Sequence, residues 1–388
     1  MQHIAISFGR ELLNIKHSYL AAALMFKNLG VKRQDIIALR LHNQELLKHS
    51  FTKPADLVRW LGAVQSQDYA GAKWALANRL KNPVESEIEE EINNGEILRT
   101  HVLRPTWHFV LPEDIRWMMD LTEPRISALS AKSFRDLNLD KAILKRSNKI
   151  IAKALESGHH LTRKELGEEL SRARIATNDL RLTFITARAE LDQIICSGAK
   201  RGKQFTYALI DQRAPNAKRL QHDEALAELS LRYFRSRGPA TMKDFTWWSG
   251  LSPIDSKRGI EIIKSQLGSC IVDEQAYFFS PSSTHPKKKS TVYLLPSYDE
   301  YTVAYRDRSL VIDPAFEDQV GHGIFNPNIV VNGQVKGSWR RELNGEKVIV
   351  EVQYFSTVGP RVHQTVSSIA KRYAKFSGKE LSFKQKRP

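Results

Sequence analysis

The chain has 388 residues, of which 41% are hydrophobic and 26% charged, and its formal net charge is +16 at pH 7. This length predicts about two to four domains that each bury a core, and no run is long and apolar enough to cross a bilayer. The positive charge favours a polyanionic partner, because each phosphate contact releases condensed counterions. Nucleic acid is the first candidate and an anionic membrane surface the second. A basic protein without such a partner is the remaining alternative.

Residues 1–34 are expected to form an N-terminal extension. The apolar run YLAAALMF within it resembles a signal peptide only faintly, because Lys27 follows closely and no small-residue cleavage site appears. An extra helix, or a leader upstream of a start at Met25, explains the segment better. The two cysteines, Cys196 and Cys270, lie among apolar residues and form no CxxC pattern. We expect both to be reduced core residues of a cytoplasmic, nucleoid-associated protein.

Residues 35–125 carry the first copy of a pattern in which helices precede a β-like run. A helix is predicted over ADLVRWLGAV, a polar turn over QSQDY, a second helix over AGAKWALANRL and strands within EILRTHVLRPTWHFVL. This order is typical of a winged helix, although this copy is the least regular.

Residues 126–214 carry the clearest copy. Thr162, with Glu165 three residues later, predicts a capped helix, and a second helix is predicted to run to Gly198. A basic glycine turn then leads into the alternating strand QFTYALI. The turn is the expected wing tip, and its basic residues are candidates for DNA contact: Lys200, Arg201 and Lys203.

Residues 215–289 repeat the order a third time. The pattern predicts a long helix over HDEALAELSLRYFRSRG, a second helix capped by Thr241 and a third beginning at Ser252-Pro253. The run CIVDEQAYFF is the expected wing strand.

Residues 290–388 change to period-two alternation, which predicts a small antiparallel sheet or a partly closed barrel. Asn332-Gly333 and Asn344-Gly345 are type I′ hairpin signals. A helix over GPRVHQTVSSIAKRYAKFSG and a basic tail follow, the tail being either a frayed terminus or an electrostatic arm. The predicted fold is therefore mainly α with β: three tandem winged helices and a C-terminal antiparallel β-rich domain.

The stretch QSQD at residues 65–68 is the first candidate for chemistry. Gln65 and Gln67 lie on the same side of the chain only if the stretch leaves helical geometry. A glutamine amide does not titrate, but it can orient a water molecule, and Asp68 is the only nearby group in the sequence that could take a proton. The alternative is a polar turn in which Asp68 caps the following helix.

The second candidate is the stretch RTHVLRPTWHFVL, where histidines and arginines alternate with apolar residues. If the stretch is extended, Arg104, Thr106 and His108 share a face that could bind a phosphate or sugar. The alternative is a wing strand with His108 hydrogen-bonded in the core. The chain has no Walker motif, dinucleotide fingerprint, HExxH or nucleophile elbow, and we expect neither a metal nor a cofactor.

Several separated motifs together resemble one family. They run from residue 38 to the C-terminal sheet and comprise RLHNQELL, ADLVRWLGAVQSQDYAGAKWALANRL, LRTHVLRPTWHFV, LTRKELGEEL, AELDQIICSG, QFTYALID and LLPSYDEYTVAYRDRS. The chain is identified by them as a member of the tandem winged-helix DNA glycosylases, which have AlkZ-like and YcaQ-like branches. Gln65 and Gln67 match the Gln-x-Gln motif of the AlkZ-like branch, while Ser66 departs from its aliphatic or aromatic middle residue.

The resemblance implies three winged helices and a β-rich domain that form a concave surface for double-stranded DNA. Because three such units in one chain already make an extended, asymmetric footprint, we expect a monomer. The resemblance also implies hydrolysis of the N-glycosidic bond of purines alkylated at N7 or N3, and the unhooking of interstrand crosslinks. Gln65 and Gln67 would then aim a water molecule, with Asp68 as a helix cap or an auxiliary electrostatic group. The rival interpretation is a winged-helix protein that binds DNA without catalysis, such as a transcription regulator.

The remaining expected DNA contacts are basic. Arg104 and His108 would meet phosphate or sugar, and a hairpin with Lys336, Arg340 and Arg341 would enter a groove unless it is a solvated basic edge strand. Asp299, Glu300 and Arg306 also match a family motif, and an ion pair between domains is the default expectation for them.

Overall fold

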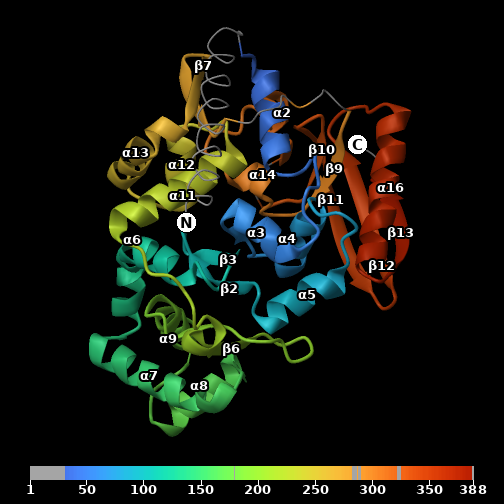
Figure 1. Ribbon diagram of the computed structural model, residues 1–388. Helices are drawn as coiled ribbons and strands as arrows, with labels where there is room; N and C mark the ends of the chain where they lie inside the picture. The colour runs from blue at the N-terminus through green and yellow to red at the C-terminus, as the bar shows by residue number, and fades with distance from the viewer. Residues whose placement is uncertain (1–30, 179, 282–285, 287–289, 321–324, 387–388) are drawn as a thin grey trace, which may run out of the picture. The chain divides into compact units, whose positions relative to one another are not determined.

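The structure is a computed structural model that describes residues 31–178, 180–281, 286, 290–320 and 325–386 (Figure 1). Its contacts divide the chain into two compact units. The first unit contains residues up to Ser50, Leu226–Trp248 and the chain from Pro253 onward, and the second unit contains Phe51–Ala225 with Ser249–Ser252. Most of the expected N-terminal extension lies outside the described residues, and the predicted division into five parts stays a prediction. None of the described helices is both long and apolar enough to cross a membrane.

The second unit contains two small antiparallel sheets, with strand orders β1-β3-β2 and β4-β6-β5. Its elements in chain order are α3 (Pro54–Leu61), β1 (Val64–Gln65), α4 (Tyr69–Ala77), α5 (Glu85–Asn94), β2 (Leu98–Val102), β3 (Thr106–Val110), α6 (Ile115–Asp136), α7 (Lys141–Ala154), a 3₁₀ turn (Glu156–Gly158), β4 (Leu161–Thr162), α8 (Arg163–Arg172), α9 (Arg181–Leu191), β5 (Ile195–Ser197), β6 (Thr206–Leu209) and α10 (Ile210–Arg213). Each sheet thus follows the same order of helix, strand, two helices and two strands.

The hairpin β2–β3 differs from the single extended segment on which a shared face for Arg104 and His108 was predicted. The chain reverses at residues 103–105, where Leu103 has a φ of 61°. Strand β3 then pairs with β1 on its other side, so that Gln65 lies opposite His108. The prediction of a shared face on one extended strand was therefore wrong.

The second sheet confirms one helix cap and corrects one helix boundary. Thr162 and Glu165 form the predicted capping box at the start of α8. The next helix was predicted to reach Gly198, but α9 ends at Leu191 because the backbone turns at Gln193, whose φ is 57°. The following residues form β5 instead and bury Cys196 completely. This burial raises the pKa of the Cys196 thiol to about 12, as expected for an unreactive core cysteine; Cys270 is only half-buried.

The first unit contains a two-stranded hairpin and a five-stranded sheet. Its elements within the described residues are α2 (Arg33–Asn43), α11 (His222–Arg237), α12 (Met242–Ser249), α13 (Pro253–Ile262), a 3₁₀ turn (Lys264–Gln266), β7 (Gly268–Val272), β8 (Gln275–Phe279), β9 (Val292–Leu295), α14 (Glu300–Val303), a 3₁₀ turn (Pro314–Phe316), α15 (Glu317–Val320), β10 (Asn328–Val331), β11 (Gln334–Asn344), β12 (Lys347–Tyr354), α16 (Pro360–Phe376) and β13 (Glu380–Gln385). The first turn of α11 and the last residue of α12 belong to the second unit. Thr241 caps α12 as predicted, since its hydroxyl accepts the Asp244 N–H at 3.1 Å.

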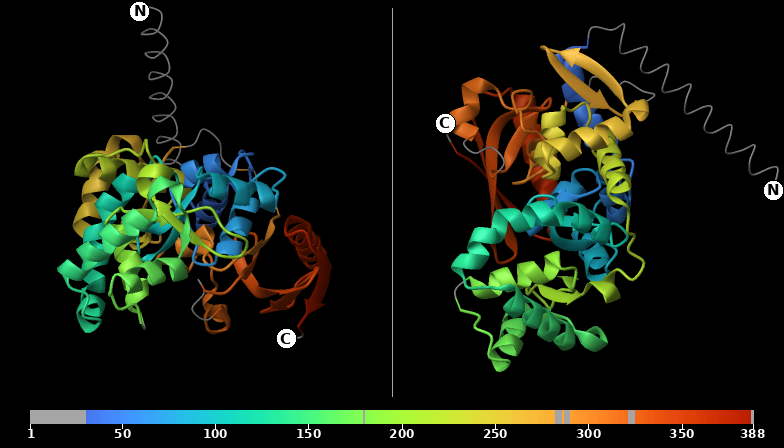
Figure 2. Two further views of the ribbon diagram at one scale, coloured as in Figure 1. Left: turned by 90° about the horizontal axis from the view of Figure 1, so that it is seen from below. Right: turned by 90° about the vertical axis from the view of Figure 1, so that its left-hand side faces the viewer.

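The five-stranded sheet has the order β13-β12-β11-β10-β9, and α16 packs along one of its faces (Figure 2). It has two edge strands, and β9 to β12 run antiparallel as predicted, whereas the parallel pairing of β13 corrects the expectation that the whole C-terminal sheet is antiparallel. Strand β13 pairs in parallel with β12, so residues as far as Gln385 form an edge strand rather than a frayed tail or an arm. Asn332 and Gly333 both have positive φ angles, as the predicted type I′ turn requires. The other two-residue turn is Gly345-Glu346, because Asn344 already pairs with Lys347.

The Asp299-Glu300 motif has a structural role. Asp299 caps α14 through the Tyr301 N–H, and Glu300 forms a buried ion pair with Arg237 of α11 at 2.6 Å. The pair joins two predicted domains that lie in the same compact unit, as expected by default. Arg306 donates its backbone N–H to Asp244, and its side chain is exposed.

Buried His42 of α2 gives the first unit a pH-dependent stability. Burial, with a smaller contribution from the positive charge of Lys48, lowers the His42 pKa from 6.5 to about 4. Between these pH values His42 is protonated in the unfolded chain but neutral in the folded chain. The free energy of unfolding therefore falls as the pH falls. We expect the urea midpoint to decline less from pH 6.5 to pH 4 in His42→Gln than in the wild type. The exposed His222→Gln is the matched control, and an unchanged decline in His42→Gln would contradict the assignment.

Candidate active site

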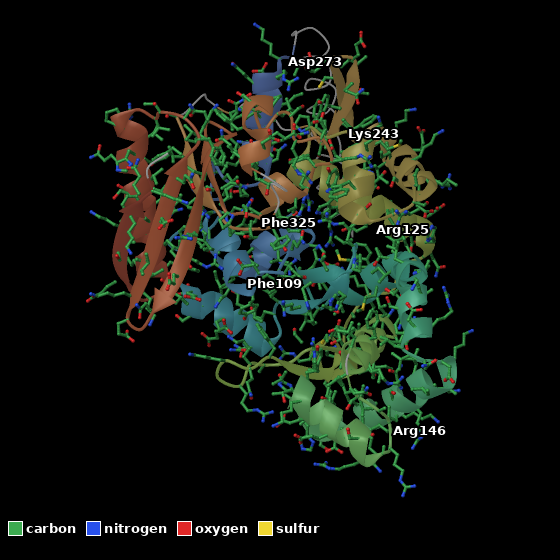
Figure 3. The ribbon with its side chains drawn as sticks, turned by 180° about the vertical axis from the view of Figure 1, so that it is seen from behind. Phe109, Arg125, Arg146, Lys243, Asp273 and Phe325 are labelled. Carbon is green, nitrogen blue, oxygen red and sulfur yellow. The ribbon has the colours of Figure 1, made fainter. Side chains whose placement is uncertain are left out.

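The Gln-Ser-Gln stretch forms the connection between β1 and α4 in the second unit. Gln65 ends the strand opposite His108, and the Ser66 N–H donates to the Trp107 carbonyl at 2.7 Å. The backbone therefore leaves helical geometry here, which confirms the condition set from the sequence. Neighbouring Phe109 of β3 is labelled in Figure 3 and is fully buried, so the connection lies against a packed strand.

The two glutamines have different surroundings. Gln65 is 5% exposed, and its Oε1 accepts a hydrogen bond from Arg104 Nη2 at 2.9 Å. Gln67 is exposed, and its Oε1 accepts from the Trp107 N–H at 3.4 Å. Gln67 is thus the member of the pair that a bound molecule can reach directly, whereas Gln65 is buried and held in place by Arg104.

Asp68 caps α4, which was the alternative reading of the stretch. Its carboxylate accepts the Gly71 N–H at 3.0 Å, and its backbone is extended rather than helical. The carboxylate therefore satisfies one of the N–H groups that the first turn of a helix leaves without a partner.

Removing this cap should affect stability more than chemistry. We expect Asp68→Ala to lower the free energy of unfolding by about 1 kcal/mol, and Asp68→Asn or Asp68→Ser to lower it by a few tenths. Urea denaturation followed by circular dichroism measures both effects. If Asp68→Asn lost activity while keeping its stability, the carboxylate would have a chemical role beyond the cap.

Arg99 fixes the middle of the stretch. Its Nη2 and Nε donate to the Ser66 carbonyl at 3.0 and 3.3 Å, and its guanidinium carbon lies 4.2 Å from the centre of the Trp107 ring. The side chain is 8% exposed, and burial lowers its pKa to about 10, so it is still charged at neutral pH. A charged, nearly inaccessible group therefore sets the position of the peptide between the two glutamines.

His101 and Glu190 form a pair that the sequence did not indicate. Nδ1 of His101 on β2 shares a short hydrogen bond with Oε2 of Glu190 on α9. Glu190 is buried, His101 is 21% exposed, and the imidazole lies 4.0 Å from the Trp107 ring. Asp68 is therefore not the only proton acceptor near the stretch. The feature of the sequence that could have pointed to Glu190 is its position between two apolar residues of α9, Ala189 and Leu191, which are both buried.

Arg104 and His108 do not present a common exposed face. His108 is fully buried, and its Nδ1–H donates to the Thr106 carbonyl at 2.9 Å, as in the alternative of a core histidine. Arg104 is half-buried and turned toward Gln65. For His108 the structure offers no surface to a phosphate; contact between Arg104 and DNA stays a prediction.

Comparison with known proteins decides the family. The family described as "DNA glycosylase AlkZ-like" matches residues 58–376. The chain belongs to this family. It is 23% identical over 335 residues to the "Interstrand DNA cross-link repair glycosylase" of Streptomyces sahachiroi, covering 82% of this chain and 89% of that protein. The solved structure of Streptomyces sahachiroi DNA glycosylase AlkZ resembles it with a TM-score of 0.75 at 21% identity, covering 92% of this chain and all of the other.

Membership makes the chain a DNA glycosylase with a mixed α/β fold and a β-rich C-terminal sheet, and DNA is its substrate. The rival interpretation of a DNA-binding protein without catalysis gains no support from these matches. Among the described residues, no three His, Cys, Asp or Glu side chains are grouped so that they could hold a metal ion.

The basic residues expected to bind DNA differ in their present partners. In the AlkZ-like chain, Lys200 pairs with Glu89 at 3.1 Å and Arg201 with Glu165 at 2.8 Å, whereas Lys203 is exposed. On β11, Arg340 is exposed and pairs with Glu351 across the hairpin at 2.9 Å. Lys336 lies 5.4 Å from the Phe316 ring and Arg341 is half-buried. A role in DNA binding stays a prediction for all of these side chains.

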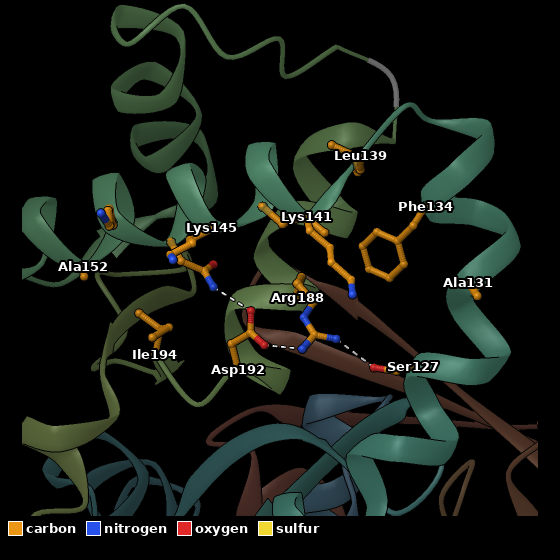
Figure 4. A pocket seen from close by; sticks show the side chains of 13 residues that line it. Ser127, Ala131, Phe134, Leu139, Lys141, Lys145, Ala152, Arg188, Asp192 and Ile194 are labelled. Atoms are coloured by element: carbon orange, nitrogen blue, oxygen red, sulfur yellow. Dashed lines mark hydrogen bonds and ion pairs between the residues drawn. The ribbon is translucent and has the colours of Figure 1, made fainter.

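A cavity of about 690 Å³ lies elsewhere in the second unit, between α6, α7 and α9 (Figure 4). Its apolar walls include Phe134 and Leu144, and Arg188 bridges Asp192 and Ser127 across it. Neither Gln65 nor Gln67 lines this cavity, so the candidate site, of which Gln67 is the exposed member, lies outside it.

Proposed function

We propose that this glycosylase hydrolyses the N-glycosidic bond of purines alkylated at N7 or N3 in double-stranded DNA, including those within interstrand crosslinks. The observation that carries the proposal is the exposed amide of Gln67, which follows a Ser66 backbone held by Arg99 and Trp107. The crosslink as substrate rests on the name of the Streptomyces sahachiroi relative.

The chemistry suits amide side chains. A purine alkylated at N7 or N3 is already cationic, so it leaves without a strong general acid, and the deoxyribose approaches an oxocarbenium ion. Catalysis then requires an aligned water molecule and correctly oriented dipoles. In our proposal Gln67 binds that water, and Gln65, aligned by Arg104, keeps the loop in register and adds its dipole.

His101 is the group we propose to accept the proton. As the C1′–N9 bond breaks, its electron pair neutralises the purine, and the water oxygen bonds to C1′. The proton released by the water passes to the His101 imidazole, which Glu190 orients through Nδ1. Asp68 is less suited to this role because its carboxylate caps α4.

We also propose that three winged helices carry the DNA. Both sheets of the second unit have the strand order first, third, second, and in the first unit an isolated bridge from Ala240 to Phe278 gives the hairpin β7–β8 the same order. Three such modules in one chain supply an extended, asymmetric footprint, so the protein is proposed to act as a monomer without a symmetric partner.

A direct assay tests the proposal. The purified protein is incubated with a duplex that contains one N7-methylguanine, and mild alkali then converts abasic sites to strand breaks. We expect breaks at the modified base and none in unmodified duplex. The absence of breaks in duplexes with N7-alkylated, N3-alkylated or crosslinked purines would refute the proposed activity. If DNA affinity still fell steeply with salt, only the DNA-binding part of the proposal would hold.

A further inference from the structure

Phe205 is a large apolar side chain exposed beside the candidate site. It lies in the connection between β5 and β6 and is 45% exposed. Its ring packs edge-to-face on Tyr69, with centroids 4.9 Å apart and planes at 79°. Tyr69 begins α4 two residues after Gln67, so this aromatic pair adjoins the loop that carries the proposed water-binding amide.

Arg99 links Phe205 to the middle of the Gln-Ser-Gln stretch. The guanidinium carbon lies 4.9 Å from the Phe205 ring centre, while Nη2 of the same side chain holds the Ser66 carbonyl. One side chain therefore separates the exposed ring from the proposed catalytic loop.

The connection that carries Phe205 is both braced and basic. Arg201 and Gln204 exchange backbone hydrogen bonds, and the Arg201 side chain is tied to Glu165. Lys200 is tied to Glu89, whereas Lys203 extends into solvent. An apolar ring on a braced loop with a basic rim is the combination with which proteins unstack DNA bases, because the cations hold the backbone while the ring enters the stack.

We propose that Phe205 stacks against a nucleobase beside the nucleotide extruded toward Gln67. This inference rests on the proposed function, because a glycosylase has to take its target out of the base stack before water can reach C1′. Phe205 replaces part of the stacking lost on extrusion. It is therefore a residue that acts on the DNA conformation and does not touch the reacting atoms.

Two substrates separate this role from a structural one. Single-turnover excision of N7-methylguanine is compared in a perfect duplex and in a bubble of three mismatched pairs, where the base is already unstacked. We expect Phe205→Ala to be about 10-fold or more slower on the duplex and within about twofold of wild type on the bubble. Phe205→Trp should restore most of the duplex rate. The matched control is Leu129→Ala, which removes an exposed apolar side chain of α6 and should change neither rate.

The outcomes that overturn the inference are distinct. Equal losses on both substrates, or a lowered melting temperature in Phe205→Ala and Phe205→Trp alike, would show that the ring only packs on Tyr69. Gln67→Ala, in contrast, should lose activity on both substrates. A binding experiment tests stacking even if the protein does not excise alkylated purines. The fluorescence of 2-aminopurine beside an abasic-site analogue should be quenched less by Phe205→Ala than by the wild type. Equal quenching would refute stacking whatever the catalytic result.

Discussion

Replacing Gln67 with alanine is expected to slow excision of N7-methylguanine by about 100- to 1,000-fold while DNA affinity stays within about twofold. The loss has this size because one oriented dipole at the developing charge is removed from a site that keeps all its other groups. Gln67 is exposed and its Oε1 accepts only a long hydrogen bond from the Trp107 N–H, so its removal should leave the loop in place. Single-turnover kinetics and fluorescence anisotropy measure the two quantities separately.

Two further variants make this result specific. Gln221→Ala removes an exposed glutamine just before α11 and should change neither rate nor affinity. Gln65→Ala should lower both rate and stability, because it opens a space in a buried position and removes one hydrogen-bond acceptor of Arg104. A Gln67→Ala protein that excised at the wild-type rate would remove Gln67 from the mechanism and direct attention to His101.

The part of the site that depends on local chain chemistry was predictable. An aspartate before a run of small helix-forming residues predicted the cap of α4, and Asp68 forms it. The departure of the stretch from helical geometry was the condition for Gln65 and Gln67 to act together, and its place between two predicted helices favoured it. The hairpin turn was not predictable in the same way, because Leu103 adopts a positive φ without any glycine or asparagine to signal it.

The contacts between distant segments were beyond reach of the sequence. Glu190 lies 89 residues from His101, and only the folding of α9 against β2 brings the two together. Periodicity marks a position as buried, but it does not identify the partner. The polar groups that hold the Gln-Ser-Gln stretch come from distant parts of the sequence. The sequence therefore predicted the polar turn but not the residues that fix it.

The second large effect concerns Glu300, which we expect to be essential for the stability of the first unit. Its Oε2 accepts hydrogen bonds from Arg237 Nη2 at 2.6 Å, from Arg237 Nε at 2.9 Å and from Trp248 Nε1 at 3.1 Å. Both charged side chains are at most 1% exposed. Glu300→Ala removes the carboxylate that faces the buried guanidinium, so the free energy of unfolding should fall by about 3–5 kcal/mol. Urea denaturation at neutral pH measures it.

We attribute the loss of stability in Glu300→Ala to a buried charge that has lost its carboxylate rather than to the loss of a strong attraction. A double variant distinguishes these two causes. Arg237→Met combined with Glu300→Leu removes both charges and should recover much of the stability lost in Glu300→Ala, because burying an ion pair costs nearly as much desolvation as its attraction returns. The exposed pair of Lys264 and Glu261, with side chains 70% and 51% exposed, is the matched control, and Glu261→Ala should cost less than about 0.5 kcal/mol. A Glu300→Ala protein as stable as Glu261→Ala would mean that water reaches Arg237 in the folded state. If the double variant were no more stable than Glu300→Ala, the pair would instead contribute a net attraction of its own.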